Sequence, residues 1–535
     1  MDHGHATSLG YRNIYLLVFS LFLFLFISQQ TFAKPAAKTT VKNVILLIGD
    51  GMGPQQYALA MSYAQLAPDA PIRKLNLEKL MSQGKVGLMM TYPKGALVVD
   101  SAASATQLAT GHYAGSEMIG LDYKGNPQAT ILELARDAGK STGLVSDTRI
   151  THATPAAFAA HQPHRSMEDK IATDLINNNV DVMLSAGLQS FLPQGVRDKK
   201  SNVYANLRQQ IPAHIKLASK RKDDRNLLNE AENKGYHLVF DRESMFMAPE
   251  SRKLLGLFDS ARMPDGIRES QTENEKSRKH PTLLEMTSKA LDRLSQNEKG
   301  FFLMIEAGQI DWAAHSSDVG TMLHQMLQFD KTIGYTMAWA RKNGDTLLVL
   351  TADHETGSFG FSYSSFETPK AKNLEGKAFT GIKYKPKYNF GTPKIIDMIY
   401  QQKKSYTEMV SEFDALPERQ QTAASLMNIV NKNSEFKISL SEAEEILKPV
   451  DGGFYVNDFK AFYVYDNRYR QNRLGITLSR HQNVVWGTGT HTATPVPVVA
   501  FGPEAITGQF NGIHHSTAVA MMMRKALGLT ISSPH

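Results

Sequence analysis

Runs of consecutive apolar residues recur along the chain, and several of them end at an acidic residue or a histidine. Uninterrupted apolar runs are typical of strands buried on both faces of a parallel sheet. They predict strands at residues 43–48, 301–305 and 346–350, with further strands at 86–90, 141–145 and 496–501. Helices are predicted between them at residues 57–64, 75–82, 130–138, 282–295 and 319–341. This alternation predicts an α/β fold with a doubly wound, mostly parallel central sheet flanked by helices.

Two long stretches lack acids at strand ends, and we expect them to be insertions at about residues 190–280 and 360–480. The second stretch has helical patterns at 395–402 and 422–431. A capping box of Ser441 and Glu444 predicts a further short helix there, which Pro449 would end.

Composition adds few constraints. The chain has 535 residues, 42% of them apolar, and a net charge of +7. No Lys/Arg tract interleaved with aromatic residues is found, so we expect a mildly basic surface and no nucleic-acid partner. Length alone would suggest several domains.

The N-terminus predicts a signal peptide over residues 1–33. An apolar stretch at 14–27 follows Arg12 and leads to the small-residue ending Thr31-Phe32-Ala33, so we expect cleavage after Ala33. The alternative is an uncleaved membrane anchor. Cleavage predicts a periplasmic or secreted protein without stable membrane association. The absence of cysteine excludes lipoprotein attachment and means that the protein is stable without disulfides.

Candidate metal ligands lie where apolar runs end. Asp50 lies between glycines after the first run, although a simple Asp-Gly turn is an equal reading. Glu306 ends the run at 301–305, and Asp353-His354 follows the run at 346–350. Asp311 and His315 have the i, i+4 spacing, which places two metal ligands on one face of a helix. The same spacing is also typical of an ordinary solvent-exposed Asp–His pair, and this alternative stays open. His491 precedes the last predicted strand, and His514-His515 are expected in a surface turn.

Ser101 is the candidate nucleophile. It lies where a strand or loop enters a helix, and a hydroxyl at a helix N-terminus suits a phosphate ligand and a deprotonated nucleophile. The alternative is that Ser101 only caps the helix. His152 and Thr154 lie two residues apart further along the chain. Arg165 is a candidate because a phosphate site uses a bidentate guanidinium.

Taken together, the motifs resemble those of the alkaline phosphatase family, in the family's order. The motifs are Gly49-Asp50-Gly51-Met52-Gly53, Asp100-Ser101-Ala102-Ala103-Ser104-Ala105-Thr106, His152-Ala153-Thr154-Pro155-Ala156-Ala157, Glu306-Ala307-Gly308 with Asp311 and His315, Thr351-Ala352-Asp353-His354-Glu355-Thr356-Gly357, and Thr490-His491-Thr492. The resemblance covers residues 43–502 apart from the two insertions. Because Asp50 and His491 would then have to meet, we expect one catalytic domain over residues 34–535 and not several.

The resemblance also implies roles for these residues. It implies a first zinc site of Asp311, His315 and His491, and a second of Asp50, Asp353 and His354 that Ser101 reaches. A third, magnesium-type site would use Asp50, Thr154 and Glu306, with His152 beside it, and Arg165 would hold phosphate. The implied cofactors are two Zn2+ ions and one Mg2+ ion, a set that agrees with the preference of zinc for mixed N/O donors and of magnesium for oxygen donors.

The implied reaction is hydrolysis of small-molecule phosphate monoesters through a phosphoserine intermediate, by a chain expected to form a homodimer. His152 and Trp312 differ from the Asp and Lys of the best-known bacterial members, and the His/Trp pair resembles some marine bacterial ones. Two other functions stay open: a phosphodiesterase or sulfatase of the same superfamily, and an exported phosphate- or metal-binding protein without catalysis.

Overall fold

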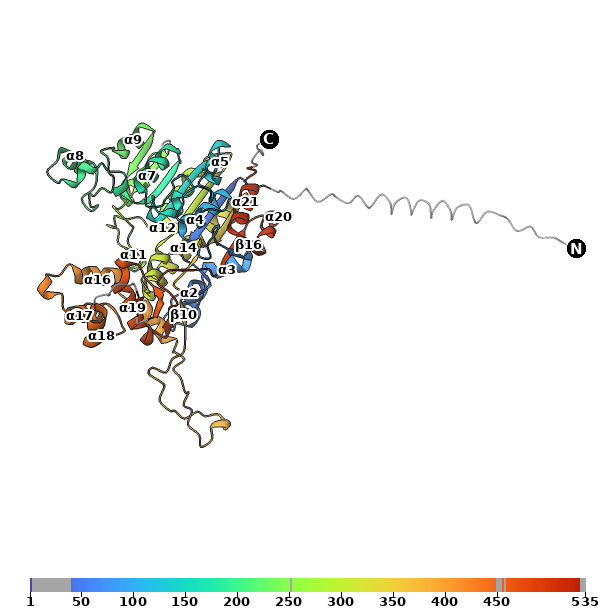
Figure 1. Cartoon of the computed structure of the whole chain (residues 1–535). Coiled ribbons are helices and arrows are strands. Elements are labelled where there is room, and N and C mark those ends of the chain that lie inside the picture. Colours follow the sequence, from blue (N-terminus) through green and yellow to red (C-terminus); the bar gives the residue numbers. More distant parts are fainter. Residues whose placement is uncertain (2–39, 251–252, 449–454, 457–458, 530–535) are drawn as a thin grey trace. The chain divides into compact units, whose positions relative to one another are not determined.

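A ten-stranded sheet forms the centre of the computed structural model (Figure 1), which describes residues 1, 40–250, 253–448, 455–456 and 459–529. Residues Thr40–His535 form one compact unit. The predicted signal peptide lies outside the described residues, apart from Met1. Among the described residues, no helix combines the length and the apolarity needed to cross a membrane. The extent of the catalytic domain stays a prediction.

The sheet is almost entirely parallel, with strand order β16-β2-β15-β8-β1-β7-β3-β4-β6-β5. Strand β15 runs antiparallel to both neighbours, and the other pairings in the sheet are parallel. The strands are β1 (Asn43–Gly49), β2 (Lys85–Met90), β3 (Ser141–Arg149), β4 (Val182–Ala186), β5 (Tyr236–Val239), β6 (Lys253–Leu257), β7 (Phe301–Ala307), β8 (Thr346–Thr351), β15 (Val496–Phe501) and β16 (Gly512–His515). The predicted mostly parallel sheet is confirmed.

The three central strands β8, β1 and β7 are buried along their whole length, which explains their uninterrupted apolar sequences. Their register aligns Ile48 of β1 with Glu306 of β7 and with Thr351 of β8. Asp50 and Asp353 follow within two residues of these positions. The parallel register therefore brings three acidic residues to one edge of the sheet.

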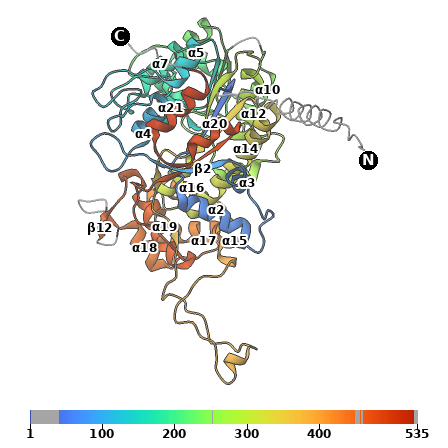
Figure 2. The same ribbon diagram turned by 90° about the vertical axis from the view of Figure 1, so that its right-hand side faces the viewer.

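Helices flank this sheet (Figures 1 and 2). Helices α12 and α14 pack against β3, β7, β1 and β8, whereas α5 packs against β3 and β7 and α21 against β2. Near the sheet lie α2 (Pro54–Leu66), α3 (Asn76–Gln83), α4 (Ser101–Thr110), α5 (Ile131–Asp137), α6 (Ala153–Ala156), α7 (Glu168–Asn177), α12 (Leu283–Leu294), α13 (Gln309–His315), α14 (Val319–Asn343), α20 (Glu504–Thr507) and α21 (Ser516–Ala526). The helices predicted around 75–82, 130–138, 282–295 and 319–341 are present within two residues of these bounds.

The stretch at 190–280 is more than an insertion. It contains α8 (Asn202–Gln210), α9 (Leu227–Asn233), α10 (Arg242–Met247) and α11 (Gly266–Thr272). It also supplies β5 and β6, which extend the central sheet beyond β4. These two strands are short, and Asp241 and Asp259 follow their ends by two residues, so an acid at the strand end is present here as well but the strands were not predicted.

The second insertion forms a group of helices, which lies below the sheet in the view of Figure 2. Its helices are α15 (Lys394–Tyr400), α16 (Tyr406–Asp414), α17 (Ala423–Asn433), α18 (Leu440–Leu447) and α19 (Tyr469–Gln482). A long arm of residues 362–393 precedes them. The predicted capping box was misplaced by two residues, because Ser439 and Glu442 form the reciprocal bonds at the start of α18. Pro449 lies outside the described residues.

The predicted surface turn at His514-His515 is also wrong. Both residues belong to strand β16, which pairs with β2 at the edge of the sheet. The Nδ1 atom of His515 then accepts the backbone N–H of Thr517 at the start of α21. Two consecutive polar histidines between apolar segments are typical of a surface turn, so the sequence pattern did not reveal an edge strand that leads directly into a helix.

Candidate functional site

Three carboxylates meet at the carboxyl ends of the central strands. Asp50, Glu306 and Asp353 are each 0% exposed. Gly51 adopts a left-handed φ of 72°, which turns the chain sharply after Asp50. Its N–H donates to Asp353 Oδ1 at 3.1 Å, so this turn joins two strand ends. The Asp-Gly turn is therefore present, and it also directs Asp50 into the cluster.

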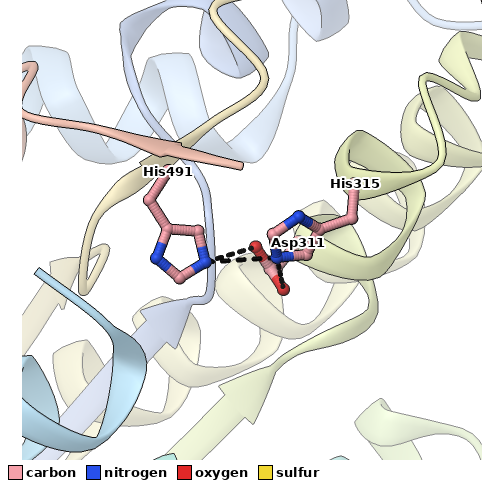
Figure 3. A group of neighbouring side chains, drawn as sticks. All are labelled: Asp311, His315 and His491. Carbon is pink, nitrogen blue, oxygen red and sulfur yellow. Dashed lines mark hydrogen bonds and ion pairs between the residues drawn. The ribbon is translucent and has the colours of Figure 1, made fainter. Parts of the chain in front are cut away.

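His491 reaches the same place through a two-stranded pairing that the sequence did not indicate. Strand β14 (His491–Thr492) pairs with β9 (Glu355–Thr356), so that His491 lies opposite Thr356. Asp311 and His315 come from helix α13, as Figure 3 shows. Two segments distant in sequence, α13 and β14, thus deliver one group of side chains.

The tautomers of the two histidines in this first group follow from their partners. His315 Nδ1 lies 2.8 Å from the Gly489 carbonyl and His491 Nδ1 lies 2.9 Å from the Val99 carbonyl. A carbonyl only accepts, so each Nδ1 carries the proton and each Nε2 keeps its lone pair. The two Nε2 atoms lie 3.1 Å apart and face Asp311 at 3.2 and 3.6 Å. Facing lone pairs this close fit a shared cation.

Ser101 is the first residue of helix α4, and Asp100, not Ser101, is its cap. The Asp100 carboxylate accepts the N–H groups of Ala102 and Ala103, so the capping alternative for Ser101 is wrong. The hydroxyl of Ser101 instead lies 3.1 Å from His354 Nε2. At this position it also lies at the positive end of the helix.

A second group consists of Asp50, Asp353 and His354, whose ligand atoms lie within 4.8 Å of one another. His354 Nε2 is 3.5 Å from Asp50 Oδ1 and 3.2 Å from Asp353 Oδ2. Both carboxylate oxygens of Asp50, and Oδ2 of Asp353, are buried without a hydrogen-bond partner among the described residues. Unpartnered buried carboxylate oxygens are costly, and a bound cation would satisfy them.

The electrostatics of the cluster agree with this geometry. Burial, and then the carboxylates of Asp353 and Asp311, raise the pKa of Asp50 well above its usual value. Burial and then Asp311 raise the pKa of Asp353 to about 8. Burial also lowers the pKa of His491 to about 4, and that of His354 well below its usual value. The protein alone therefore favours neutral imidazoles, the form in which histidine binds metals.

A third group adds His152 and Glu306 to Asp50. His152 Nδ1 lies 3.3 Å from Glu306 Oε1 and 4.0 Å from Asp50 Oδ2. The Thr154 hydroxyl is fully buried and has no hydrogen-bond partner among the described residues. A buried hydroxyl without a partner, two residues after His152, is an oxygen donor of the kind that a third cation held by Asp50 and Glu306 would use.

Arg165 lies beside this cluster at the mouth of the site. Its Nη1 donates to Asp100 Oδ2 at 3.1 Å, and its Nη2 lies 3.4 Å from His152 Nε2. A cavity of about 260 Å³ opens in front of it. The cavity is lined by Ser101, Glu117, His152, Arg165, Asp311, Trp312, His315, Tyr465, Arg468 and His491. Ser101 and Arg165 thus face one space, sized for a small anion and part of its substituent.

Several residues of the site were missed by the sequence analysis. Asp100 could have been found, because Asp before a run of small helix formers is a standard cap. Ser146 and Thr148 hold Glu306 Oε2 at 2.5 and 3.0 Å, and Thr356 donates to Asp311 Oδ1 at 2.6 Å. Tyr465 and Arg468 enter the cavity from the second insertion, for which no local pattern gave a signal. The structure brings together ten of the eleven residues proposed from the sequence, and the eleventh, Thr154, lies buried in helix α6.

Comparison with known proteins agrees with the motif resemblance. The alkaline phosphatase family model matches residues 41–529. Alkaline phosphatase 3 of Bacillus subtilis is 30% identical over 510 residues, which cover 93% of this chain and 91% of the relative. The repressible alkaline phosphatase of Saccharomyces cerevisiae is 29% identical, over 94% of this chain and 84% of its own. The solved alkaline phosphatase of Thermus thermophilus aligns with a TM-score of 0.75 at 26% identity, over 94% of each chain.

Proposed function

The chain belongs to the alkaline phosphatase family. We propose that it hydrolyses phosphate monoesters through a phosphoserine intermediate on Ser101. The observation that carries this proposal is the position of the Ser101 hydroxyl, 3.1 Å from His354 Nε2, beside buried carboxylate oxygens that lack partners. A buried cluster of this charge needs cations, and a serine at its edge would face them.

The donor sets support two zinc ions and one magnesium ion. Asp311, His315 and His491 form one mixed N/O set, and Asp50, Asp353 and His354 form another, as zinc prefers. The third set, with Asp50, Glu306 and the Thr154 hydroxyl, is richer in oxygen and suits magnesium, with His152 adding one imidazole. When bound, the ions would neutralise the carboxylates and lower the pKa of a coordinated hydroxyl or water.

The chain's own residues provide the nucleophile and its orientation. The Ser101 oxygen forms a bond to phosphorus as the ester bond breaks and the alcohol leaves. Water then attacks the same phosphorus, which releases inorganic phosphate and restores the serine hydroxyl. The Arg165 guanidinium, oriented by Asp100, would bind the non-bridging oxygens, together with the backbone N–H of Ser101.

A comparison of two substrates tests this function. We expect kcat/KM for p-nitrophenyl phosphate to exceed that for bis(p-nitrophenyl) phosphate by at least about 100-fold, and a chelator to abolish both activities. Faster hydrolysis of the diester would favour a phosphodiesterase, the alternative of the same superfamily. Stoichiometric phosphate binding without turnover would favour a non-catalytic binding protein.

We further propose that the mature protein begins after Ala33 and acts in the periplasm or as a secreted protein, as a homodimer. Exposed apolar side chains support the dimer: Ile513 on the edge strand β16 is 72% exposed, and Leu97 in the loop between β2 and α4 is 84% exposed. Light scattering on the purified protein would give the oligomeric state, and N-terminal sequencing would give the cleavage site.

A further inference from the structure

We propose that Glu117 and His164 form a latch that holds the segment carrying Arg165 against the Ser101 cavity, which makes Glu117 a positioning residue for phosphate binding. The latch is the contact between the Glu117 carboxylate and the His164 imidazole. This inference rests on the proposed phosphatase function and deepens it, because it names a second group, beyond Asp100, that orients the arginine.

Glu117 has an unusual backbone conformation for a glutamate. It lies in a turn between α4 and α5, with a left-handed φ of 63°. A residue with a Cβ atom is strained in this region, where glycine would fit without cost. Strain of this kind is concentrated at functional sites, and the side chain of Glu117 lines the Ser101 cavity. The carboxylate therefore has a use that a glycine at this position would not provide.

The backbone of Glu117 already joins two sides of the phosphate site. Its N–H donates to Asp100 Oδ1 at 2.8 Å, and its carbonyl accepts the N–H of Arg165 at 2.8 Å. Two further backbone bonds between Ile119 and Gln162, at 3.0 and 2.9 Å, continue this antiparallel pairing. The turn at Glu117 and the segment that ends at Arg165 therefore lie side by side.

The side chains add a contact whose direction a neighbouring residue defines. His164 Nδ1 accepts the backbone N–H of Ser166 at 3.1 Å, so this nitrogen keeps its lone pair. The proton of the neutral ring is then on Nε2, which donates to Glu117 Oε2 at 2.6 Å. This hydrogen bond is charge-assisted, because its acceptor is a carboxylate. It joins His164, the residue next to Arg165, to the wall of the cavity.

The latch complements the contact that Asp100 provides. Asp100 Oδ2 accepts from Arg165 Nη1 and so orients the guanidinium, whereas the latch acts on the backbone beside the arginine. A guanidinium binds two phosphate oxygens in one plane, so its contribution to binding depends on its orientation. Loosening this backbone should therefore weaken the binding of phosphate and of phosphate esters, with little effect on the nucleophile Ser101.

The expected effect is modest. The side chains of Glu117 and His164 are 52% and 46% exposed, and water competes for such a contact. We expect its loss to raise KM for p-nitrophenyl phosphate and Ki for inorganic phosphate by about threefold each, with kcat changed by less than about twofold. Steady-state kinetics at one fixed pH, with inorganic phosphate as a competitive inhibitor, measures all three constants.

A purely electrostatic role of Glu117 would have the opposite sign. A negative charge beside the cavity repels phosphate, so its removal would lower KM and Ki. Glu117→Gln removes the charge and keeps an amide oxygen that accepts from His164, and we expect both constants within about twofold of wild type. E117G and H164A each remove the contact and should show the full increase. The double variant E117G/H164A should show the same increase and not its square, because both changes break one interaction.

Glu367→Gly is the matched control. Glu367 also has a left-handed φ, of 50°, and its Oε1 lies 3.8 Å from His481 Nδ1, but it lies on the arm of residues 362–393 and does not line the Ser101 cavity. Both glycine variants remove backbone strain, so neither should melt more than about 2 °C below wild type in a thermal-shift assay. Only E117G should change KM and Ki.

Wild-type kinetics in E117G or H164A, or effects that multiply in the double variant, would overturn the latch and leave the phosphatase function standing. E117Q constants as far from wild type as those of E117G would also overturn it, and so would equal changes in E117G and E367G. A wild-type protein that does not hydrolyse p-nitrophenyl phosphate would overturn the proposed function, and the latch with it.

Discussion

Replacing Asp353 with Asn should change stability in opposite directions with and without metal. Asp353 Oδ1 accepts the N–H groups of Gly51 and His354, at 3.1 and 2.9 Å, whereas Oδ2 is buried without a donor. An asparagine keeps both accepted bonds and places its amide NH₂ where Oδ2 stood, facing the carboxylate of Asp50. The substitution therefore removes one buried negative charge with little change of shape.

The magnitude follows from the raised pKa. Burial and then Asp311 raise the pKa of Asp353 to about 8, compared with about 4 in the unfolded chain. Without metal, folding at about pH 7 must therefore protonate this group, which costs about 4 kcal/mol at 1.36 kcal/mol per pKa unit. Relaxation of the folded protein reduces this cost to about half, or about 2 kcal/mol. Because 1 kcal/mol shifts the melting temperature by about 2 °C, we expect metal-free D353N to melt about 4 °C above metal-free wild type.

The pH dependence has a definite sign. Between about pH 4 and pH 8 the folded metal-free protein binds more protons at Asp353 than the unfolded chain does, so stability falls as pH rises through this window. The D353N variant should lose part of that slope. With metal present, the variant lacks a ligand and should melt lower than wild type, with activity reduced at least about 100-fold.

Differential scanning fluorimetry at several pH values, with and without chelator, measures both effects. Asp318→Asn is the control, because both oxygens of Asp318 accept hydrogen bonds from donors such as Thr321 N, Gln402 Nε2 and Tyr406 N. Asp318→Asn should destabilise both the metal-free and the metal-bound protein, because the amide NH₂ of the asparagine would face hydrogen-bond donors and accept from none of them. A D353N protein less stable than wild type in the metal-free form would refute the argument that like charges are crowded at the strand ends.

Three further predictions concern neighbouring residues. Ser101→Ala should remove the phosphoenzyme trapped by acid quench and lower turnover by at least about 1,000-fold, and undiminished turnover would contradict its role. Asp100→Ala should lower the free energy of unfolding by about 1 kcal/mol, because α4 loses its cap, as chemical denaturation would measure. The same variant should raise KM for p-nitrophenyl phosphate several-fold, about tenfold at most, because Arg165 is no longer held in place, as steady-state kinetics would measure. Ser146→Ala should weaken magnesium binding about tenfold by loosening Glu306, and a magnesium titration of activity that matches wild type would exclude this.

The central strands and their acids could be predicted from sequence for one physical reason. A strand buried on both faces has no polar positions, so its end is visible as the first polar residue, and parallel strands end at one edge. Asp50, Glu306 and Asp353 were found in this way. His491 differs from them: it precedes a strand instead of ending one, its pairing with β9 had no local signal, and only the motif resemblance gave it a role in a metal site.

Other features depend on contacts that local patterns do not encode. Ser439 and Ser441 each precede a glutamate by three residues, so the pattern of a capping box fits both, and only the packing of α18 selects Ser439. Strand β5 lies at the sheet edge and includes His237, and the short run at 254–258 in and after β6 lies in a polar part of the sequence, so neither was predicted. Arg468 and Tyr465 reach the cavity through the tertiary position of the second insertion, which their own neighbours in sequence do not determine.

The most direct test of the central claim, that buried acids and imidazoles from distant segments hold three cations around Ser101, is the metal content of the purified protein measured together with its activity. We expect close to three divalent ions per chain, two of zinc and one of magnesium. Chelation should remove them and abolish hydrolysis of p-nitrophenyl phosphate, and both ions together should restore it. A metal-free protein that retains full activity, or fewer than one bound ion per chain in the active protein, would contradict the claim.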